Sequence, residues 1–110
     1  MGNAKKDRQP KVGGDLRLER IERRTSGGGA WARGTLNGHR FEALCFPEHA
    51  ENPDYEIGQS RISKLWLSKL SNKETSFNWD RGLDVPAASQ KVQAVVDFLA
   101  AGLADYVYAR

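Results

Sequence analysis

The sequence contains a single cysteine, Cys45, among its 110 residues, and this scarcity removes several kinds of site. One thiol cannot form an intrachain disulfide, and zinc or iron–sulfur sites built from four thiolates are excluded for the same reason. Only two histidines, His39 and His49, are present. No run of about eighteen apolar residues occurs, so we predict no membrane-spanning helix and no membrane partner.

Four of the first eight residues are charged, and no apolar stretch follows them. A secretory signal needs such a stretch, so we expect none and predict a cytoplasmic protein. A length of 110 residues is typical of one domain. We expect a basic, disordered tail over residues 1–14, a basic segment with a glycine-rich link over 15–30, and a single domain over 31–110.

The charge of the chain is unevenly distributed. There are 17 Lys and Arg residues against 14 Asp and Glu, a net charge of +3. Residues 1–30 hold eight basic and four acidic residues, whereas residues 31–110 hold nine and ten. The excess positive charge therefore lies at the N-terminus, in an arm that either binds phosphate backbones or is a solvated tail. The basic residues that would hold nucleic acid are Lys5, Lys6, Arg8, Arg17, Arg20, Arg23 and Arg24.

The clearest structural signal is a β-hairpin. Two alternating segments, residues 31–36 and 39–46, flank Asn37-Gly38, the pair that a type I′ turn prefers. This turn fixes the register of the two strands. The expected cross-strand pairs are Leu36 with His39, Gly34 with Phe41, and Arg33 with Glu42. One face is then apolar and buried, with the Phe41 ring over the gap at Gly34, and Cys45 on this face is interpreted as a small buried hydrophobe.

Less regular segments flank the hairpin. Residues 15–24 alternate only in part and fit either a short edge strand or a short helix. Pro47 ends the second hairpin strand, because proline cannot donate to a strand ladder. Residues 47–60 then form a long loop with four acidic residues and no Lys or Arg. Loops of this length are uncommon in compact domains and are often functional.

Two more strands are expected after the loop, over residues 61–70 and 75–80. With a turn at Asn72-Lys73, Trp66 would lie opposite Trp79. A loop one residue longer or shorter would pair different residues and move side chains to the other face.

Residues 87–106 have a helical pattern, because apolar residues recur at three- and four-residue steps. These residues are Val92, Val95, Val96, Leu99, Leu103 and Tyr106. Pro86 suits a helix start, and Gly102 indicates close contact with another element. The order of elements predicts an α+β fold: an antiparallel sheet of about four strands, with a fifth if residues 15–24 form a strand, and one C-terminal helix packed on one face.

No set of residues has the pattern of a catalytic or cofactor site, so we expect a non-enzymatic protein without cofactor or metal. The glycines at 27–29 precede a strand, whereas a phosphate-binding loop follows a strand and opens a helix. His49, with Glu48, Glu51 and Asp54, is a weak candidate for holding a hard cation.

Two features indicate binding surfaces. A single helix covers only one sheet face, so the other face is left to solvent or to a partner. Tryptophans on that open face, beside Arg33 and Arg40, would stack nucleobases or anchor a protein; otherwise they belong to the core or its border. The acidic loop is the second feature. The candidate partner-binding residues are Trp31, Arg33, Arg40, Trp66, Trp79, Glu48, Glu51, Asp54 and Tyr55.

Three short motifs stand out in the folded part of the chain. They are Trp31-x-x-Gly34-x-x-Asn37-Gly38-x-x-Phe41, Ile62-Ser63-Lys64-Leu65 and Asp80-Arg81-Gly82-x-Asp84. Over residues 31–105 the chain thereby resembles small uncharacterised domains encoded by bacteriophages, plasmids and related mobile elements. The resemblance implies a sheet-plus-helix body in a mobile-element setting, and it offers no known catalytic residues to carry over.

Two functions follow from these expectations. The leading hypothesis is a binding protein that engages a protein or ribonucleoprotein partner through the open sheet face and the acidic loop. A mobile-element-encoded inhibitor of a host-defence complex would be one instance. The alternative is a nucleic-acid-binding accessory protein, in which the basic N-terminal arm holds phosphates and exposed tryptophans stack bases.

Overall fold

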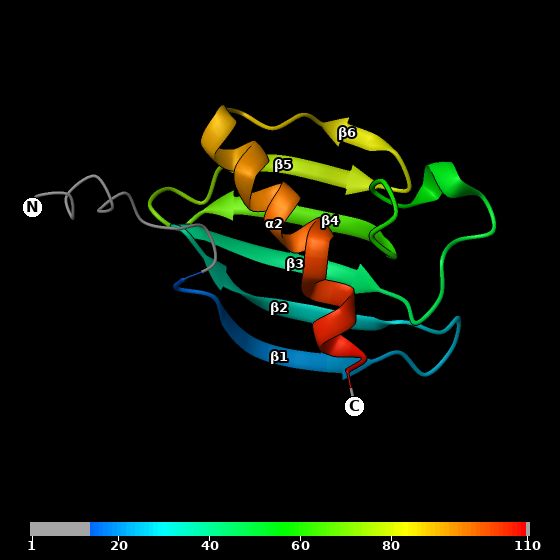
Figure 1. The fold of residues 1–110 in the computed structure, drawn as a ribbon. Coiled ribbons are helices and arrows are strands. Elements are labelled where there is room, and N and C mark those ends of the chain that lie inside the picture. Colours follow the sequence, from blue (N-terminus) through cyan, green and yellow to red (C-terminus); the bar gives the residue numbers. More distant parts are fainter. Residues whose placement is uncertain (1–13, 110) are drawn as a thin grey trace, which may run out of the picture.

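The computed structural model describes residues 14–109, which form one antiparallel sheet crossed by one helix (Figure 1). The six strands are hydrogen-bonded in sequence order: β1 (Arg17–Arg23), β2 (Ala30–Leu36), β3 (His39–Cys45), β4 (Ile62–Lys69), β5 (Thr75–Asp80) and β6 (Leu83–Val85). A turn of 3-10 helix, η1 (Pro53–Tyr55), precedes β4, and helix α2 spans Gln90–Val107. The α+β class is confirmed, with more strands than predicted. Within the described residues, no helix is long and apolar enough to cross a membrane.

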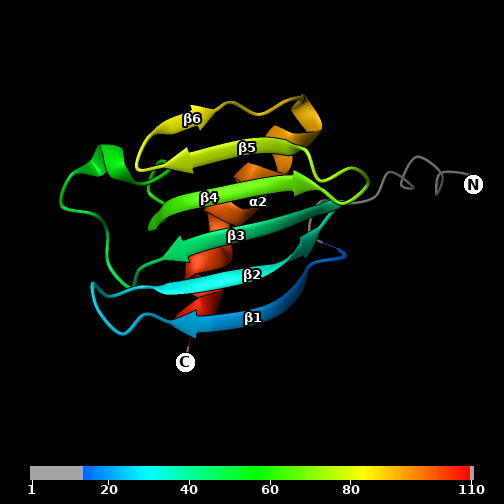
Figure 2. The same ribbon diagram turned by 180° about the vertical axis from the view of Figure 1, so that it is seen from behind.

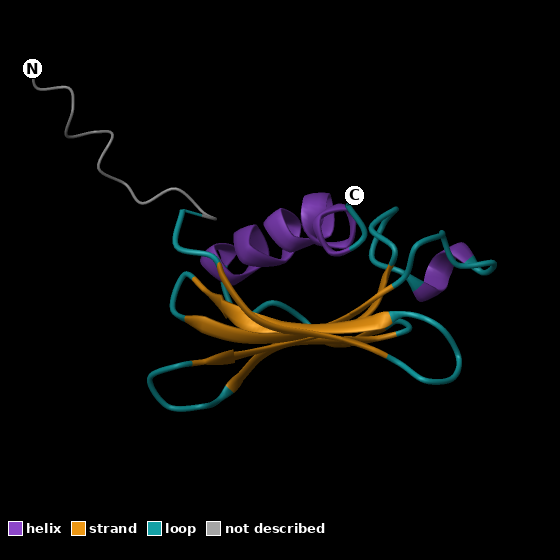
Figure 3. Ribbon diagram, turned by 90° about the horizontal axis from the view of Figure 1, so that it is seen from below, coloured by secondary structure: helices purple, strands orange, loops and turns teal. Residues whose placement is uncertain are grey.

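The elements form two layers (Figure 3). Helix α2 runs diagonally across one face of the sheet, and η1 lies on the same side (Figures 1 and 3). Seen from behind, the strands lie in front of the helix, and no other helix or strand of residues 14–109 covers them (Figure 2). The core lies between α2 and the sheet, where Phe41 is fully buried. The opposite sheet face is called the open face below.

The β2–β3 hairpin has the predicted register. Leu36 lies opposite His39, Gly34 opposite Phe41, and Arg33 opposite Glu42. The turn residues Asn37 and Gly38 have φ angles of 51° and 80°, as a type I′ turn requires. The register is confirmed because a two-residue turn and an alternating pattern both specify it.

The ambiguous segment at residues 15–24 contains strand β1, which pairs antiparallel with β2. A bulge between Leu18 and Arg20 interrupts the pairing. The strand lies at the sheet edge and consists largely of exposed charged residues, which protect such an edge from pairing with other chains. The predicted tail, residues 1–14, lies outside the described residues except for Gly14.

The predicted pairing of Trp66 with Trp79 is wrong. Trp66 lies opposite Asn78, and Trp79 lies opposite Leu65. The pairing departs from the predicted one already at the turn, where the Lys69 amide donates to the Glu74 carbonyl and Ser68 lies opposite Thr75. A bulge at Ser76, opposite Leu67 and Ser68, then shifts the pairing by one residue. The two tryptophans therefore lie on opposite faces of the sheet.

The C-terminal helix begins later than predicted. Ser89, rather than Pro86, marks its start: the Ser89 hydroxyl accepts a hydrogen bond of 3.2 Å from the Val92 amide. Five of the six predicted stripe residues are buried, but Tyr106 is 64% exposed. The close contact expected at Gly102 is absent, because no atom of the described neighbours lies within 4 Å of the position its Cβ would occupy.

Strand β6 was not predicted. Arg81 and Gly82, with φ angles of 57° and 146°, reverse the chain after β5, and Leu83–Val85 returns along it. Three residues are too few to show an alternating pattern, so the sequence suggested only a turn here.

Candidate functional site

The open face carries two of the three tryptophans. Trp31 on β2 lies opposite Leu44 of β3, and Trp66 on β4 lies opposite Glu42 of the same strand. Both indole rings are half-buried, and the Trp66 Nε1 donates a hydrogen bond of 3.0 Å to the Thr75 hydroxyl. The two rings thus flank β3 as fixed aromatic groups.

The charges of the open face are balanced. Five basic and five acidic side chains lie on it: Arg17, Arg20, Arg33, Arg40, Lys64, Glu19, Glu22, Glu42, Asp80 and Asp84. Arg33 lies between two carboxylates, 3.4 Å from Glu22 and 3.5 Å from Glu42. Its guanidinium is also 5.9 Å from the Trp31 ring centre. The guanidinium of Arg40 is 2.9 Å from Glu19.

Trp79 does not belong to this surface, so its prediction as a partner-binding residue of the open face is wrong. The side chain packs on the core side of the sheet. Its Nε1 donates a hydrogen bond of 3.2 Å to the carbonyl of Tyr55. Trp79 therefore holds η1 against the helix side of the sheet.

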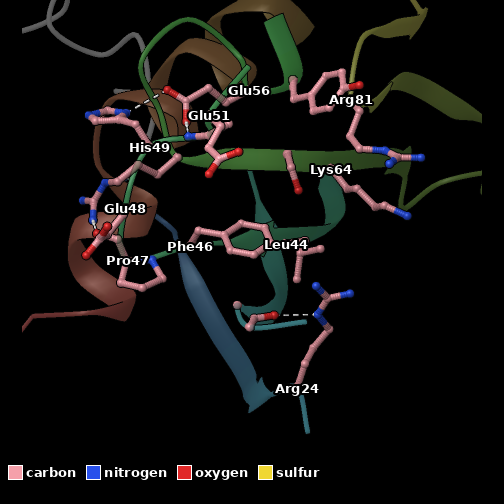
Figure 4. A pocket seen from close by; sticks show the side chains of 16 residues that line it. Arg24, Leu44, Phe46, Pro47, Glu48, His49, Glu51, Glu56, Lys64 and Arg81 are labelled. Carbon is pink, nitrogen blue, oxygen red and sulfur yellow. Dashed lines mark hydrogen bonds and ion pairs between the residues drawn. The ribbon is translucent and has the colours of Figure 1, made fainter. Parts of the chain in front are cut away.

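A cavity of about 700 Å³ opens at one end of the sheet (Figure 4). Three segments that are distant in sequence meet there: the β1–β2 loop, the loop after β3, and the β5–β6 turn. Leu44 and Phe46 lie at its centre, and Leu44 is only 2% exposed. The volume is in the range of small-ligand sites.

Three cations line one side of this cavity: Arg24, Lys64 and Arg81. The Arg24 guanidinium donates to the Gly28 carbonyl at 2.7 Å and lies 5.7 Å from the Phe46 ring centre. The Arg81 guanidinium lies 5.8 Å from the Tyr55 ring centre.

One carboxylate lies close to two of these cations. Asp80 is 3.5 Å from the Lys64 ammonium and 3.8 Å from the Arg81 guanidinium. It offsets part of their charge, so the cation-lined side keeps an excess of about two positive charges.

The acidic loop forms the other side of the cavity. Glu56 is buried, 5% exposed, and accepts hydrogen bonds from the Ala50 amide at 3.0 Å and the His49 ring at 2.8 Å. Sequence reasoning grouped His49 with other acids and missed Glu56, because only tertiary packing buries that carboxylate. Glu48 and Glu51 line the cavity with Tyr55, whereas Asp54 is not among its lining residues. Within residues 14–109, no three His, Cys, Asp or Glu residues are grouped so that they could hold a metal ion.

Cys45 lies on the helix side of the sheet and is fully buried. Burial raises the pKa of its thiol from 9.0 to about 12, although the nearby positive charge of Arg61 acts in the opposite direction. A thiol with such a pKa is almost entirely protonated at neutral pH and is a poor nucleophile.

The basic residues near the N-terminus do not form one surface. Arg17 and Arg20 lie on the open face, whereas Arg23 lies over the Tyr108 ring on the helix side, 5.1 Å from its centre. Arg24 binds the glycine loop beside the cavity. The remaining candidates, Lys5, Lys6 and Arg8, lie outside the described residues.

Comparison with protein families gives one match. Residues 30–104 match the model of a domain of unknown function, DUF7678. The chain belongs to this family. The DUF7678 match begins at the first residue of β2 and ends within α2. It includes Trp31, Trp66 and most of the cavity lining, but neither β1 nor the β1–β2 loop, which contributes Arg24, Gly28 and Gly29 to the cavity. Searches of curated proteins and of solved structures gave no match.

Proposed function

We propose that this protein is a non-enzymatic binding module for a protein partner, which docks on the open face and in the cavity at its end. The observation that supports this is the continuity of the two: Leu44 and Lys64 belong to the open face and also line the cavity. Trp31 and Trp66 lie beside them. These four residues, with Phe46 and Arg81, are called the docking surface.

The electrostatics of the open face favour a protein over nucleic acid. A surface that binds phosphate backbones needs an excess of available cations, whereas here Arg33 and Arg40 are paired with carboxylates. Two half-buried tryptophans among paired charges are typical of an interface with another protein, in which aromatic anchors lie among polar groups.

The proposal includes a protein subunit of a ribonucleoprotein complex as the partner. Inhibition of a host-defence complex by a mobile-element protein would be one consequence of such docking. Both kinds of partner would bind the docking surface, so one experiment tests whether that surface binds a protein.

The test compares the amount of partner protein that is captured by the full chain and by each of two matched charge-reversal variants. Lys64→Glu changes the middle of the docking surface, and Lys91→Glu changes an exposed lysine of α2 on the other side of the molecule. We expect one stoichiometric protein to be retained by the wild type and by Lys91→Glu, and at least tenfold less of it by Lys64→Glu. Equal retention of the partner by Lys64→Glu would contradict the proposal.

Nucleic acid is tested in parallel with short single-stranded RNA and DNA at about 50 and 200 mM salt. We expect no binding that exceeds the weak, salt-sensitive association of any basic chain. Tight binding that is lost in the triple variant Lys5→Gln, Lys6→Gln, Arg8→Gln would replace the proposed function with the nucleic-acid alternative.

A further inference from the structure

We infer that the cavity binds a carboxylate that lies next to a large apolar side chain, as in an acidic–aromatic segment of a partner protein. This inference deepens the proposed function and rests on it. It names the part of the partner that enters the cavity.

The floor is apolar. Leu44 is almost completely buried and Phe46 half-buried, and both lie between the charged sides of the cavity (Figure 4). A volume of about 700 Å³ accommodates an aromatic side chain together with its backbone. An apolar group that enters it removes the exposed part of the Phe46 ring from water, which a small inorganic anion does not do.

The cations are oriented and retain hydrogen-bond donors. Two donors of Arg24 are used by the Gly27 and Gly28 carbonyls, and its Nη1 has no hydrogen-bond partner among the described residues. The Arg81 guanidinium lies over Tyr55 and also makes no hydrogen bond within that part of the chain. Guanidinium groups held over aromatic rings present planar pairs of donors, which match a carboxylate.

The acids restrict the charge and position of the ligand. Glu48 and the His49–Glu56 pair lie on the side opposite Arg24, Lys64 and Arg81 (Figure 4). The fourth cation of the lining, Arg61, is already occupied, because it pairs with Asp105 and donates to the Pro47 carbonyl. A carboxylate is therefore favoured on the side of Arg24, Lys64 and Arg81. Because Asp80 offsets part of the charge of Lys64 and Arg81, that side matches one or two negative charges better than a polyphosphate.

The test uses two small probes that differ in one group. N-acetyl-phenylalanine has a carboxylate beside an aromatic ring, and N-acetyl-phenylalaninamide is its neutral counterpart. A fitting ligand of this size reaches a Kd of about 1 mM, which amide chemical shifts in NMR titrations of the full chain measure well. We expect the acid to shift the amides of Gly28, Gly29 and Phe46 and to bind about tenfold more tightly than the amide.

Variants locate the binding groups. Arg81→Gln and Lys64→Gln are each expected to weaken binding of the acid about fivefold to tenfold, and Lys91→Gln is expected to leave it unchanged. The amide spectra of the variants show whether each is folded. Two independent substitutions keep the test valid if one of them disturbs its turn or strand.

The inference is overturned if the acid and the amide bind equally, if neither shifts these amides at about 10 mM, or if inorganic phosphate binds as tightly as the acid. Equal binding of inorganic phosphate would mean that the apolar floor contributes nothing to the affinity for the acid. The probes do not depend on the partner. If they fail while Lys64→Glu still loses the captured protein, the inference is wrong and the proposed function stands.

Discussion

The ring of Phe41 on β3 packs against Gly34 on β2, with its Cζ atom 3.1 Å from the position that a Gly34 Cβ would occupy. The same Cβ would collide with the backbone carbonyl oxygen of Arg17 on β1. Glycine therefore allows the central ring of the core and the edge strand to approach together. We expect Gly34→Ala to lower the free energy of unfolding by about 1–3 kcal/mol, because β1 must move away or the ring must tilt.

Chemical denaturation followed by tryptophan fluorescence measures this change. The matched control is Gly102→Ala, where an added Cβ meets open space and the residue lies within α2. Alanine should stabilise the helix there by up to about 1 kcal/mol. If Gly34→Ala leaves the free energy of unfolding unchanged or raises it, as Gly102→Ala should, packing at Gly34 is not the reason for its glycine.

Ser76 provides a second stability test. Its hydroxyl is buried, with the residue 1% exposed, and has no hydrogen-bond partner among the described residues. We expect Ser76→Ala to raise the free energy of unfolding by about 1 kcal/mol, because an unpaired buried polar group is removed. In the control Ser60→Ala, the hydroxyl that accepts from the Ile62 amide at 3.0 Å is lost, and stability should fall by a similar amount. Urea unfolding of the two variants measures both changes in the free energy of unfolding and shows whether they have opposite signs.

The thiol of Cys45 gives a prediction about pH. Its pKa of about 12 in the folded protein exceeds the ordinary value of 9.0, so the unfolded chain loses this proton first as pH rises. Below pH 9 the thiol is protonated in both states and has no effect on the pH dependence. Between about pH 9 and 12 it should lower stability by up to about 1.4 kcal/mol per pH unit.

The difference in stability between wild type and Cys45→Ala isolates this slope from the titration of lysines and tyrosines. A difference that is independent of pH above 9 would contradict the raised pKa. Alkylation at pH 8 provides a second measurement, because the folded thiol should react orders of magnitude more slowly than the same thiol in urea.

Local signals explain which parts of the fold the sequence predicted. Asn37-Gly38 permits one turn, and the alternation on each side permits one register, so the hairpin was predicted pair by pair. The apolar stripe of α2 was predicted for the same reason, since the spacing from Val92 to Leu103 fits one helical face. Each of these patterns is contained in a short stretch of chain.

The remaining features depend on contacts between distant residues. The bulge at Ser76 of β5, which places Trp66 and Trp79 on opposite faces, has no distinctive amino-acid composition. Strand β6 is too short to show an alternating pattern. Of the predicted site residues, Trp31, Arg33, Arg40 and Trp66 lie together on the open face. The cavity was missed because its residues come from three loops and the ends of two strands, and their convergence is a property of the whole sheet.

Glu56 holds the loop that forms one side of the cavity. Its two carboxylate oxygens accept from the Ala50 amide and the His49 ring, so Glu56→Ala leaves both without their acceptor. We expect amide hydrogen exchange at Ala50 to accelerate about tenfold, corresponding to about 1.4 kcal/mol of local stability. Glu51→Ala, an exposed change in the same loop, should leave that exchange rate unaltered.

Because the loop shapes the cavity, Glu56→Ala should also weaken binding of N-acetyl-phenylalanine, although this substitution removes a negative charge from the site. Tighter binding in that variant would mean that charge, rather than the shape maintained by the buried carboxylate, governs the cavity.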